Sequence, residues 1–371
     1  MTGRNCFLIA GGGTGGHLTP GLAVAAELLK SDPDCRIVFA GADRPLEHSL
    51  VLAAGYERHA LPSEPLALLR RRPLRFVYRN WKALRMAAAL IAAEQPRAVI
   101  GLGAFASVPV VWAASRRRIP TLILEQNVIP GRATRFLSRR VDAVCTAFDA
   151  TAAALKRGSH VIVTGNPVRR EIAGLFAQGT RELPAAPPTL LVLGGSQGAQ
   201  SLNDAVLAMF SQYLPQLTGW RVVHQTGAAQ CDELARSYAQ MGLTHVVKPF
   251  FDDLASWYAK ATLAISRAGA TTLAELACAG CPAVLVPYPH AADHHQLLNA
   301  RHFEAAGAAT VIEHGDTASA TASRLAEHVD RLTQSTALRA EMRGAMLRQA
   351  RPDAVRNVLA ALQSLAPGLM R

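Results

Sequence analysis

Residues 7–17 read FLIAGGGTGGH and residues 190–199 read LLVLGGSQGA, and these two stretches decide the fold. In each, a short apolar run typical of a buried parallel strand leads into glycines that allow a sharp turn into a helix. Such a turn leaves backbone N–H groups at the positive end of the helix, bare of side chains, where phosphate can approach. Because each loop opens its own α/β segment, the sequence predicts two Rossmann-like, doubly wound parallel-sheet domains facing a central cleft.

The composition indicates a compact soluble protein. A chain of 371 residues exceeds one ordinary core, and 50% of its residues are hydrophobic while 6% are aromatic. Arg4 is followed by too few apolar residues for a signal peptide, so secretion is not expected. The cysteines are scattered through predicted core segments, which favours reduced thiols in a cytosolic compartment. They are Cys6, Cys35, Cys145, Cys231, Cys278 and Cys281.

Strand-like runs alternate with helical segments along both halves, which predicts a parallel sheet in each. In the first half we expect a helix over 18–30 and strands at 36–40, 98–100, 121–124 and 143–146. The pattern restarts at residue 189, with strands near 221–224, 245–247, 263–266 and 283–287 and a last helix over about 352–365.

The apolar stretch 98–114 is the one serious candidate for a transmembrane helix. It is short of the ~20 residues that a spanning helix needs. Gly101, Gly103 and Pro109 also interrupt it, so a strand, a loop and a helix are expected instead.

The net charge of +12 is unevenly distributed. No acidic residue lies between Glu64 and Glu94, whereas seven basic residues do, and further basic clusters occupy 116–118 and 139–140. From Leu74 onward the spacing predicts a helix with Phe76 and Tyr78 off its apolar face, which suits an anionic membrane surface, although a solvated basic face is the alternative. No nucleic-acid-binding module is recognisable. The predicted apolar face comprises Val77, Trp81, Leu84, Ala88 and Ile91.

The first glycine loop fits G-x-G-x-x-G, so a dinucleotide site is one interpretation, with Asp43 at the ribose. However, the loop ends in His17, and a titratable imidazole beside a phosphate-binding turn suits proton transfer. The alternative for His17 is a helix cap.

Polar residues also follow the strands of the second half. Ser196 and Gln197 lie on the turn, and Asn203 follows one helical turn later. Glu275 lies on the helix after residues 266–269 (SRAG), where a carboxylate can bind ribose hydroxyls or simply stabilise the helix dipole. Arg169 follows a Gly-Asn-Pro turn and could neutralise a diphosphate leaving group, or be a surface arginine at the hinge between the domains.

Cys278 and Cys281 precede His290, His294 and His295, which raises a metal site as an alternative. The spacing is shorter than that of zinc fingers, and the cysteine pair ends a helix before a predicted buried strand. A structural interpretation is therefore preferred to zinc or redox chemistry.

In their order along the chain, these motifs resemble the MurG family, the peptidoglycan N-acetylglucosaminyltransferases that convert lipid I to lipid II. The matching segments span nearly the whole chain. They are 12–17 (GGTGGH), 125–127 (EQN), 130–131 (PG), 165–169 (GNPVR), 194–199 (GGSQGA), 266–270 (SRAGA), Glu275, 293–296 (DHHQ) and 299–300 (NA).

The resemblance implies a GT-B glycosyltransferase without a metal or cofactor. Residues 1–168 and the C-terminal helix 353–371 would form the domain that faces acceptor and membrane, and residues 169–352 would bind UDP-GlcNAc. Implied partners are the undecaprenyl-diphosphate-linked acceptor lipid I, the anionic inner-membrane surface on its cytoplasmic face, and other cell-wall synthesis proteins, but no nucleic acid.

The resemblance also assigns residues to the donor. Ser196 and Arg169 would contact the diphosphate, Glu275 the ribose and Gln296 the sugar hydroxyls, and Phe251 would lie where the family's backbone holds uracil. The remaining residues of the expected donor site are Gln197, Asn203, Arg267, Ala270 and Thr271.

On the other side, the residues expected to face the acceptor and the donor sugar are Thr14, Gly15, Gly16, His17, Glu125 and Asn127. The chain departs from the family pattern at Leu124, where histidine is frequent, and at Ala104 and Phe105, which replace Gly-Tyr.

The implied reaction is a single inverting displacement at the anomeric carbon, with His17 as the first choice of base and Glu125 as the second. Alternatives are a nicotinamide-dependent dehydrogenase, a related GT-B enzyme with another lipid acceptor such as diacylglycerol, and a non-catalytic nucleic-acid-binding protein.

Overall fold

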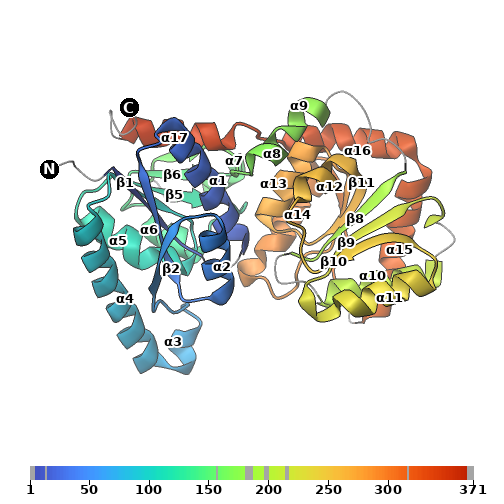
Figure 1. The fold of residues 1–371 in the computed structure, drawn as a ribbon, viewed down its shortest axis with the longest axis horizontal. Coiled ribbons are helices and arrows are strands. Elements are labelled where there is room, and N and C mark those ends of the chain that lie inside the picture. Colours follow the sequence, from blue (N-terminus) through green and yellow to red (C-terminus); the bar gives the residue numbers. More distant parts are fainter. Residues whose placement is uncertain are drawn as a thin grey trace. The chain divides into compact units, whose positions relative to one another are not determined.

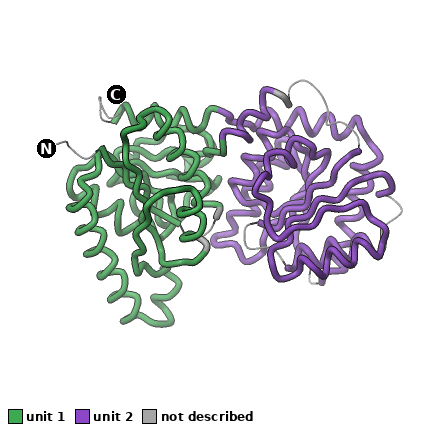
Figure 2. The backbone as a smooth tube through the Cα atoms, viewed as in Figure 1, with its two compact units in different colours: residues 1–169, 353–371 green, residues 170–352 purple. Residues whose placement is uncertain are grey.

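The computed structural model describes residues 5–12, 15–155, 158–179, 187–195, 200–213, 217–315 and 317–365. The chain divides into two compact units: unit 1 comprises residues 1–169 and 353–371, and unit 2 comprises residues 170–352 (Figure 2). Each unit contains one parallel sheet with helices on both faces (Figure 1). The predicted α/β class with two Rossmann-like domains is therefore confirmed.

Unit 1 has a seven-stranded sheet in the order β3-β2-β1-β4-β5-β6-β7, and every pair is parallel. Its strands are β1 (Cys6–Ala10), β2 (Arg36–Ala42), β3 (Glu57–Leu61), β4 (Ala98–Gly101), β5 (Thr121–Glu125), β6 (Ala143–Thr146) and β7 (Val161–Val163). Its helices are α1 (Gly15–Ser31), α2 (Pro45–Ala53), α3 (Leu68–Arg71), α4 (Pro73–Glu94), η1 (Phe105–Ser107), α5 (Val108–Arg116), α6 (Arg132–Leu137), α7 (Asp149–Ala154) and α17 (Ala354–Leu365).

Side chains of the strands alternate between two buried layers, as the pleat requires. Phe7 and Ile9 of β1 pack with residues of α1 and α17, whereas Leu8 packs on the other face with residues of α4 and α5. The last helix is tied to this unit by polar contact too, because Asn357 donates through Nδ2 to the carbonyl oxygen of Thr164 at 3.2 Å.

Unit 2 has a six-stranded parallel sheet in the order β10-β9-β8-β11-β12-β13. Its strands are β8 (Thr189–Leu193), β9 (Arg221–Gln225), β10 (Thr244–Lys248), β11 (Ala261–Ser266), β12 (Ala283–Leu285) and β13 (Ala309–Val311). Its helices are α8 (Arg170–Ala173), α9 (Leu175–Gly179), α10 (Gln200–Tyr213), η3 (Ala228–Gln230), α11 (Cys231–Gln240), α12 (Leu254–Lys260), α13 (Ala270–Ala279), η4 (Ala292–His294), α14 (His295–Ala305), α15 (Ala318–Gln334) and α16 (Thr336–Gln349).

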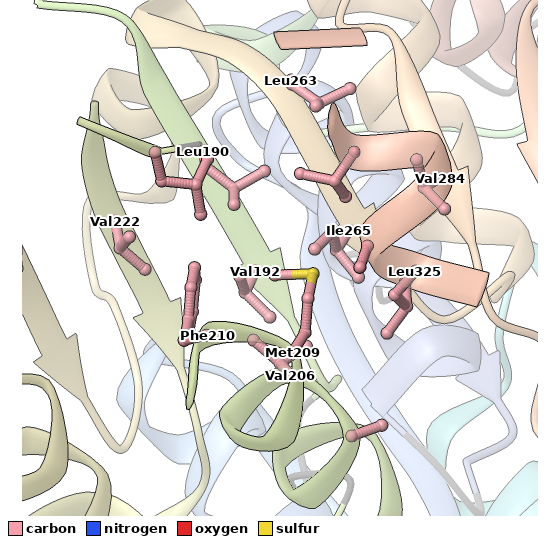
Figure 3. Packing of buried hydrophobic residues seen from close by; sticks show 14 of the residues in the cluster. Leu190, Val192, Val206, Met209, Phe210, Val222, Leu263, Ile265, Val284 and Leu325 are labelled. Atoms are coloured by element: carbon pink, nitrogen blue, oxygen red, sulfur yellow. The ribbon is translucent and has the colours of Figure 1, made fainter. Parts of the chain in front are cut away.

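The core of unit 2 joins the sheet to α10 and α15. Leu190 and Val192 of β8 and Ile265 of β11 point toward Met209 and Phe210 of α10 (Figure 3). This apolar layer fixes α10, the helix that follows the second glycine loop, against the sheet.

The predicted basic helix forms α4, and its apolar face is only partly buried. Its buried residues are Ala83, Ala87, Leu90, Ile91 and Glu94. Of the predicted apolar face, Ile91 is buried, but Val77 and Trp81 are 60% and 52% exposed. The spacing of apolar residues along a helix does not show which of them another element covers. The half of α4 next to α3 lies at the periphery of unit 1, where the other described elements of that unit leave it exposed (Figure 1).

The apolar stretch 98–114 forms β4, η1 and α5, as expected. None of the helices within the described ranges combines the length and apolar character needed to cross a membrane.

Candidate active site

Both glycine loops lie where the strand order of their sheet reverses. In unit 1 this point lies between β1 and β4, and in unit 2 it lies between β8 and β11. Chains that leave neighbouring strands in opposite directions open a crevice at the carboxyl edge, where open α/β sheets bind ligands. The topology of each unit therefore points to the loops that the sequence singles out.

In unit 1, Gly11 and Gly12 continue β1 with φ values of 149° and 143°. The N–H of Gly11 donates to the carbonyl oxygen of Ala40 at 2.9 Å, which ties the turn to β2. Gly15 and Gly16 begin α1, and His17 lies half-buried in its first turn. Gly13 and Thr14 lie outside the described residues.

Glu125 ends β5 and is 3% exposed. Its Oε1 accepts hydrogen bonds from the backbone N–H of Asn127 at 3.1 Å and from Asn127 Nδ2 at 3.2 Å. Its Oε2 accepts from the N–H of Gly131 at 2.9 Å. The carboxylate thus organises the whole 125–131 loop and orients the side chain of Asn127.

Arg169 follows the turn after β7. Gly165, with φ of 85°, donates its N–H to the carbonyl oxygen of Thr146 at 3.2 Å, and Asn166 is buried beside it. Arg169 itself is half-buried and is the last residue of the first segment of unit 1.

In unit 2, Gly194 and Gly195 continue β8, and Gly195 has φ of 90°. Ser196 and Gln197 lie outside the described residues. Asn203, in the first turns of α10, is 1% exposed. Its Nδ2 donates to the carbonyl oxygen of Thr226 and to Oε1 of Gln230, both at 2.9 Å.

The remaining amide atom of Asn203 is bonded to His224. His224 Nε2 lies 3.1 Å from Asn203 Oδ1, and His224 Nδ1 lies 2.8 Å from the hydroxyl of Tyr238. Because an amide oxygen only accepts, Nε2 carries the proton and Nδ1 accepts from Tyr238. Burial lowers the pKa of His224 to about 3, so the imidazole is neutral. Asn203 is thus engaged on all sides within the domain interior.

Arg267 follows β11 and is 6% exposed. Its Nη1 donates to the carbonyl oxygen of Val286 at 2.9 Å, and its Nη2 donates to Oγ of Ser201 at 2.8 Å. Its guanidinium also lies over the ring of Tyr288, 5.7 Å from the centroid. Burial lowers its pKa to about 10, so it keeps its charge at neutral pH. A buried cation therefore links the β11 loop to the helix behind the second glycine loop.

Helix α13 begins at Ala270, and Ala270, Thr271 and Glu275 are all buried. The hydroxyl of Tyr258 on α12 donates to Oε2 of Glu275 at 3.0 Å. This contact orients the carboxylate that the resemblance assigns to ribose.

Two further predicted residues have their polar groups engaged within unit 2. The backbone N–H of Phe251 donates to Oε1 of Gln225 at 3.2 Å, and its ring packs 5.8 Å from that of Trp257. Gln296, at the start of α14, accepts through Oε1 from the N–H of Tyr288 at 2.9 Å. Asp293 and His294 just before it have φ of 49° and 53°, a left-handed conformation uncommon outside glycine.

The cysteine–histidine set does not form a metal site of the expected kind. Cys278 and Cys281 are buried, and burial raises their pKa values to about 11 and about 12, whereas His290 and His294 are exposed. Across the described ranges, no group of three or more His, Cys, Asp or Glu side chains could hold a metal ion.

Sequence reasoning missed several residues that support these loops. Tyr258, Ser201 and Tyr288 contact predicted site residues, yet each lies in an ordinary helical or loop context. Tyr288 alone carried a signal, because it follows a strand predicted to end at the same sheet edge as Arg267.

Comparison with known proteins agrees with this geometry. Residues 7–146 match the N-terminal domain of glycosyltransferase family 28, and residues 189–358 match its C-terminal domain. A solved MurG structure from Acinetobacter baumannii superposes with a TM-score of 0.74 and 29% identity, covering 97% of this chain and 99% of that one. A UDP-GlcNAc 2-epimerase from Neisseria meningitidis, 12% identical with a TM-score of 0.66, shares the fold.

Two curated relatives are more similar in sequence. One from Desulfotalea psychrophila is 37% identical over 98% of each chain, and one from Hahella chejuensis is 38% identical over 97% of each. Both are named UDP-N-acetylglucosamine–N-acetylmuramyl-(pentapeptide) pyrophosphoryl-undecaprenol N-acetylglucosamine transferase. The resemblance drawn from the motifs is confirmed, and the chain belongs to the MurG family of glycosyltransferases.

Proposed function

We propose that this glycosyltransferase moves GlcNAc from UDP-GlcNAc to the 4-hydroxyl of MurNAc-pentapeptide on undecaprenyl diphosphate, with inversion at the anomeric carbon. The observation that carries the proposal is the position of the family's motifs. Those in the described residues follow the carboxyl ends of strands in both sheets, and those after β1, β8 and β11 lie at the points where strand order reverses. The names of the curated relatives supply the substrates.

Unit 2 is assigned the donor. The buried Glu275 carboxylate, held by Tyr258, suits the paired hydroxyls of a ribose. The cationic Arg267 and the N-terminal region of α10 favour the diphosphate beside the second glycine loop. Ser196 and Gln197 on that loop, together with Arg169, complete the diphosphate contacts in this proposal.

The sugar and base contacts fall to other residues of unit 2. Gln296 is assigned the GlcNAc hydroxyls, with Ala270 and Thr271 at the start of α13 close to the same edge. The segment at Phe251 is assigned uracil. Asn203 enters the proposal as a support for α10 rather than as a direct contact, because its amide is fully engaged by Thr226, Gln230 and His224.

Unit 1 is assigned the acceptor, with Thr14, Gly15, Gly16 and Asn127 as binding residues and His17 as the base. The imidazole of His17 takes the proton of the attacking hydroxyl, while UDP leaves from the face of the anomeric carbon opposite to the attack. Glu125 is less suited to that step, because both carboxylate oxygens already accept hydrogen bonds from its own loop. Loop N–H groups and arginine stabilise the negative charge that develops on UDP as it leaves.

We further propose that α4 brings the enzyme to the cytoplasmic face of the inner membrane as a peripheral protein. Leu74, Val77 and Trp81 are spaced along one side of the helix with Tyr78 beside them, and all four are 52–86% exposed. Arginines and a lysine flank them, and Arg85 lies over the Trp81 ring at 5.0 Å. An exposed apolar stripe with basic neighbours suits an anionic bilayer surface that also carries a polyprenyl acceptor.

The experiment that tests the acceptor is transfer of radiolabelled GlcNAc to a short-chain lipid I analogue, with diacylglycerol vesicles in parallel. We expect product only with the lipid I analogue. Product on diacylglycerol alone would move the chain to another lipid acceptor. Binding of NADH without transfer would favour the dehydrogenase alternative, in which the exposed Asp43 after β2 binds a ribose.

A further inference from the structure

A buried carboxylate lies directly beneath the first glycine loop, and neither the motifs nor the reaction described above uses it. Glu47 occupies the first turn of α2, yet it is 2% exposed. Acidic residues in a first turn ordinarily reach solvent at the helix N-terminus. The burial of this one therefore calls for a specific partner.

That partner is Arg58 on β3. Arg58 Nη2 lies 3.2 Å from Oε2 of Glu47 and also donates to the carbonyl oxygen of Ala42 at the end of β2. Both charged side chains are 3% exposed. A carboxylate and a guanidinium are retained in such a dry position only when they are paired and hydrogen-bonded.

The carboxylate packs against Gly12, which follows β1, and against Gly41, which lies in β2. A Cβ atom on Gly12 would overlap with the carboxylate of Glu47, and a Cβ atom on Gly41 would lie 2.9 Å from Oε2. A Cβ on Gly41 would also overlap with the carbonyl oxygen of Gly11. Glu47 thus fills the space that bare backbone leaves between the turn after β1 and the end of β2.

This position matters because Gly12 leads into the loop that delivers His17. The chain passes from Gly12 to the first turn of α1 within three residues. A fixed position of Gly12 therefore limits where α1 can begin and where the imidazole of His17 can lie. Pairing with Arg58 also cancels the negative charge, which would otherwise repel a diphosphate bound to the loop.

We propose that Glu47, neutralised by Arg58, is a positioning residue that holds Gly12, at the start of the first glycine loop, where use of the diphosphate-linked acceptor requires it. The inference rests on the proposed function, because it assigns that loop to the acceptor. It predicts that loss of the carboxylate impairs use of the acceptor and leaves donor binding, which belongs to the other unit, unchanged.

The test compares Glu47→Gln with wild type in the full-length enzyme. The readouts are kcat and KM for a short-chain lipid I analogue and Kd for UDP by calorimetry. We expect kcat/KM for the acceptor to fall about tenfold to a hundredfold, as misplacement of a catalytic loop does. The Kd for UDP should stay within about twofold of wild type, since the Glu47–Arg58 pair lies wholly in unit 1.

Glu94→Gln is the matched control. Glu94 is likewise buried and pairs with Arg36, but Arg36 begins β2, at the opposite end of the strand from Gly41. Its loss should lower thermal stability without changing the acceptor parameters. If Glu47→Gln does not fold, Glu47→Asp keeps the charge but withdraws the carboxylate from the glycines, and should give a smaller acceptor defect of the same kind.

Acceptor parameters in Glu47→Gln equal to wild type would overturn the inference, as would an equal loss in Glu94→Gln. Failure of the proposed function would look different, because wild type itself would then transfer no GlcNAc to the lipid I analogue.

Discussion

Oε2 of Glu275 accepts a hydrogen bond of 3.0 Å from the hydroxyl of Tyr258, and both side chains are buried in unit 2. A tyrosine on α12 therefore fixes the direction of a carboxylate on α13 before any nucleotide is bound. A carboxylate that is already oriented loses little conformational entropy when it binds a ribose. This pair is therefore expected to determine the affinity for UDP-GlcNAc.

Glu275→Ala should raise the KM for UDP-GlcNAc more than it lowers kcat, since the ribose contact is made in ground and transition states alike. Tyr258→Phe should raise the same KM by about two- to tenfold, the worth of one hydrogen bond. Initial rates at varied donor concentration measure both. Tyr56→Phe, at a half-buried tyrosine of unit 1 whose ring packs against Phe39, serves as the control. An unaltered KM in Glu275→Ala would remove the ribose assignment.

Variants of His17 and Glu125 are expected to lose activity in different ways. His17→Ala should lower kcat by about a hundredfold to ten-thousandfold, the usual loss of a general base, with Kd for UDP unchanged. Turnover equal to wild type in this variant would exclude His17 as the base.

Glu125→Gln should keep part of the activity, because an amide oxygen still accepts some of the hydrogen bonds from Asn127 and Gly131. Glu125→Ala leaves all three donors unpaired and should also cost about 1–3 kcal/mol of unfolding free energy for each donor left without water. Equal, complete inactivation of both variants at wild-type stability would instead identify Glu125 as the base.

The buried His224 gives the stability of unit 2 a defined pH dependence. Its pKa in the native state is about 3, against 6.5 ordinarily. Between these values the unfolded chain binds the extra proton, so stability is lost as pH falls from about 6.5 toward 3. At about pH 5 this loss amounts to about 2 kcal/mol relative to neutral pH. His224→Gln, whose amide can still donate to Asn203, should show a smaller loss in urea titrations; identical pH profiles would contradict this account.

The exposed stripe on α4 predicts that membrane binding depends on the side chains of this one helix face. Val77→Ser combined with Trp81→Ala should weaken sedimentation with phosphatidylglycerol vesicles by about tenfold or more, as expected from the apolar area removed. Leu52→Ser, at an exposed leucine on α2, is the control and should not change vesicle binding. Binding should also weaken as salt is raised, because basic residues contribute. Unchanged binding in the double variant would place the contact elsewhere.

The sequence predicted most of both sheets because central parallel strands are continuous apolar runs. The edge strand β10 was predicted near 245–247, but the other three edge strands were missed because they lack such a run. β3 carries Glu57, Arg58 and His59, and β7 and β13 have three residues each. Polar or very short edges have no pattern that distinguishes them from loops.

For the candidate site, motifs indicated which loops matter but not what holds them. The interior network of Asn203 and His224, and the Glu47–Arg58 pair, join residues from separate strands and helices. Such partners become visible only when the fold brings them together. The exposure of Val77 and Trp81 likewise depends on what packs over α4, which spacing does not encode.

The most direct measurement is transfer of radiolabelled GlcNAc from UDP-GlcNAc to a short-chain lipid I analogue, with UDP-glucose and UDP-GalNAc as competing donors and the anomeric configuration of the product determined by NMR. We expect robust transfer from UDP-GlcNAc alone, giving a β-linked product. No transfer, equal use of the three donors, or an α-linked product would contradict it.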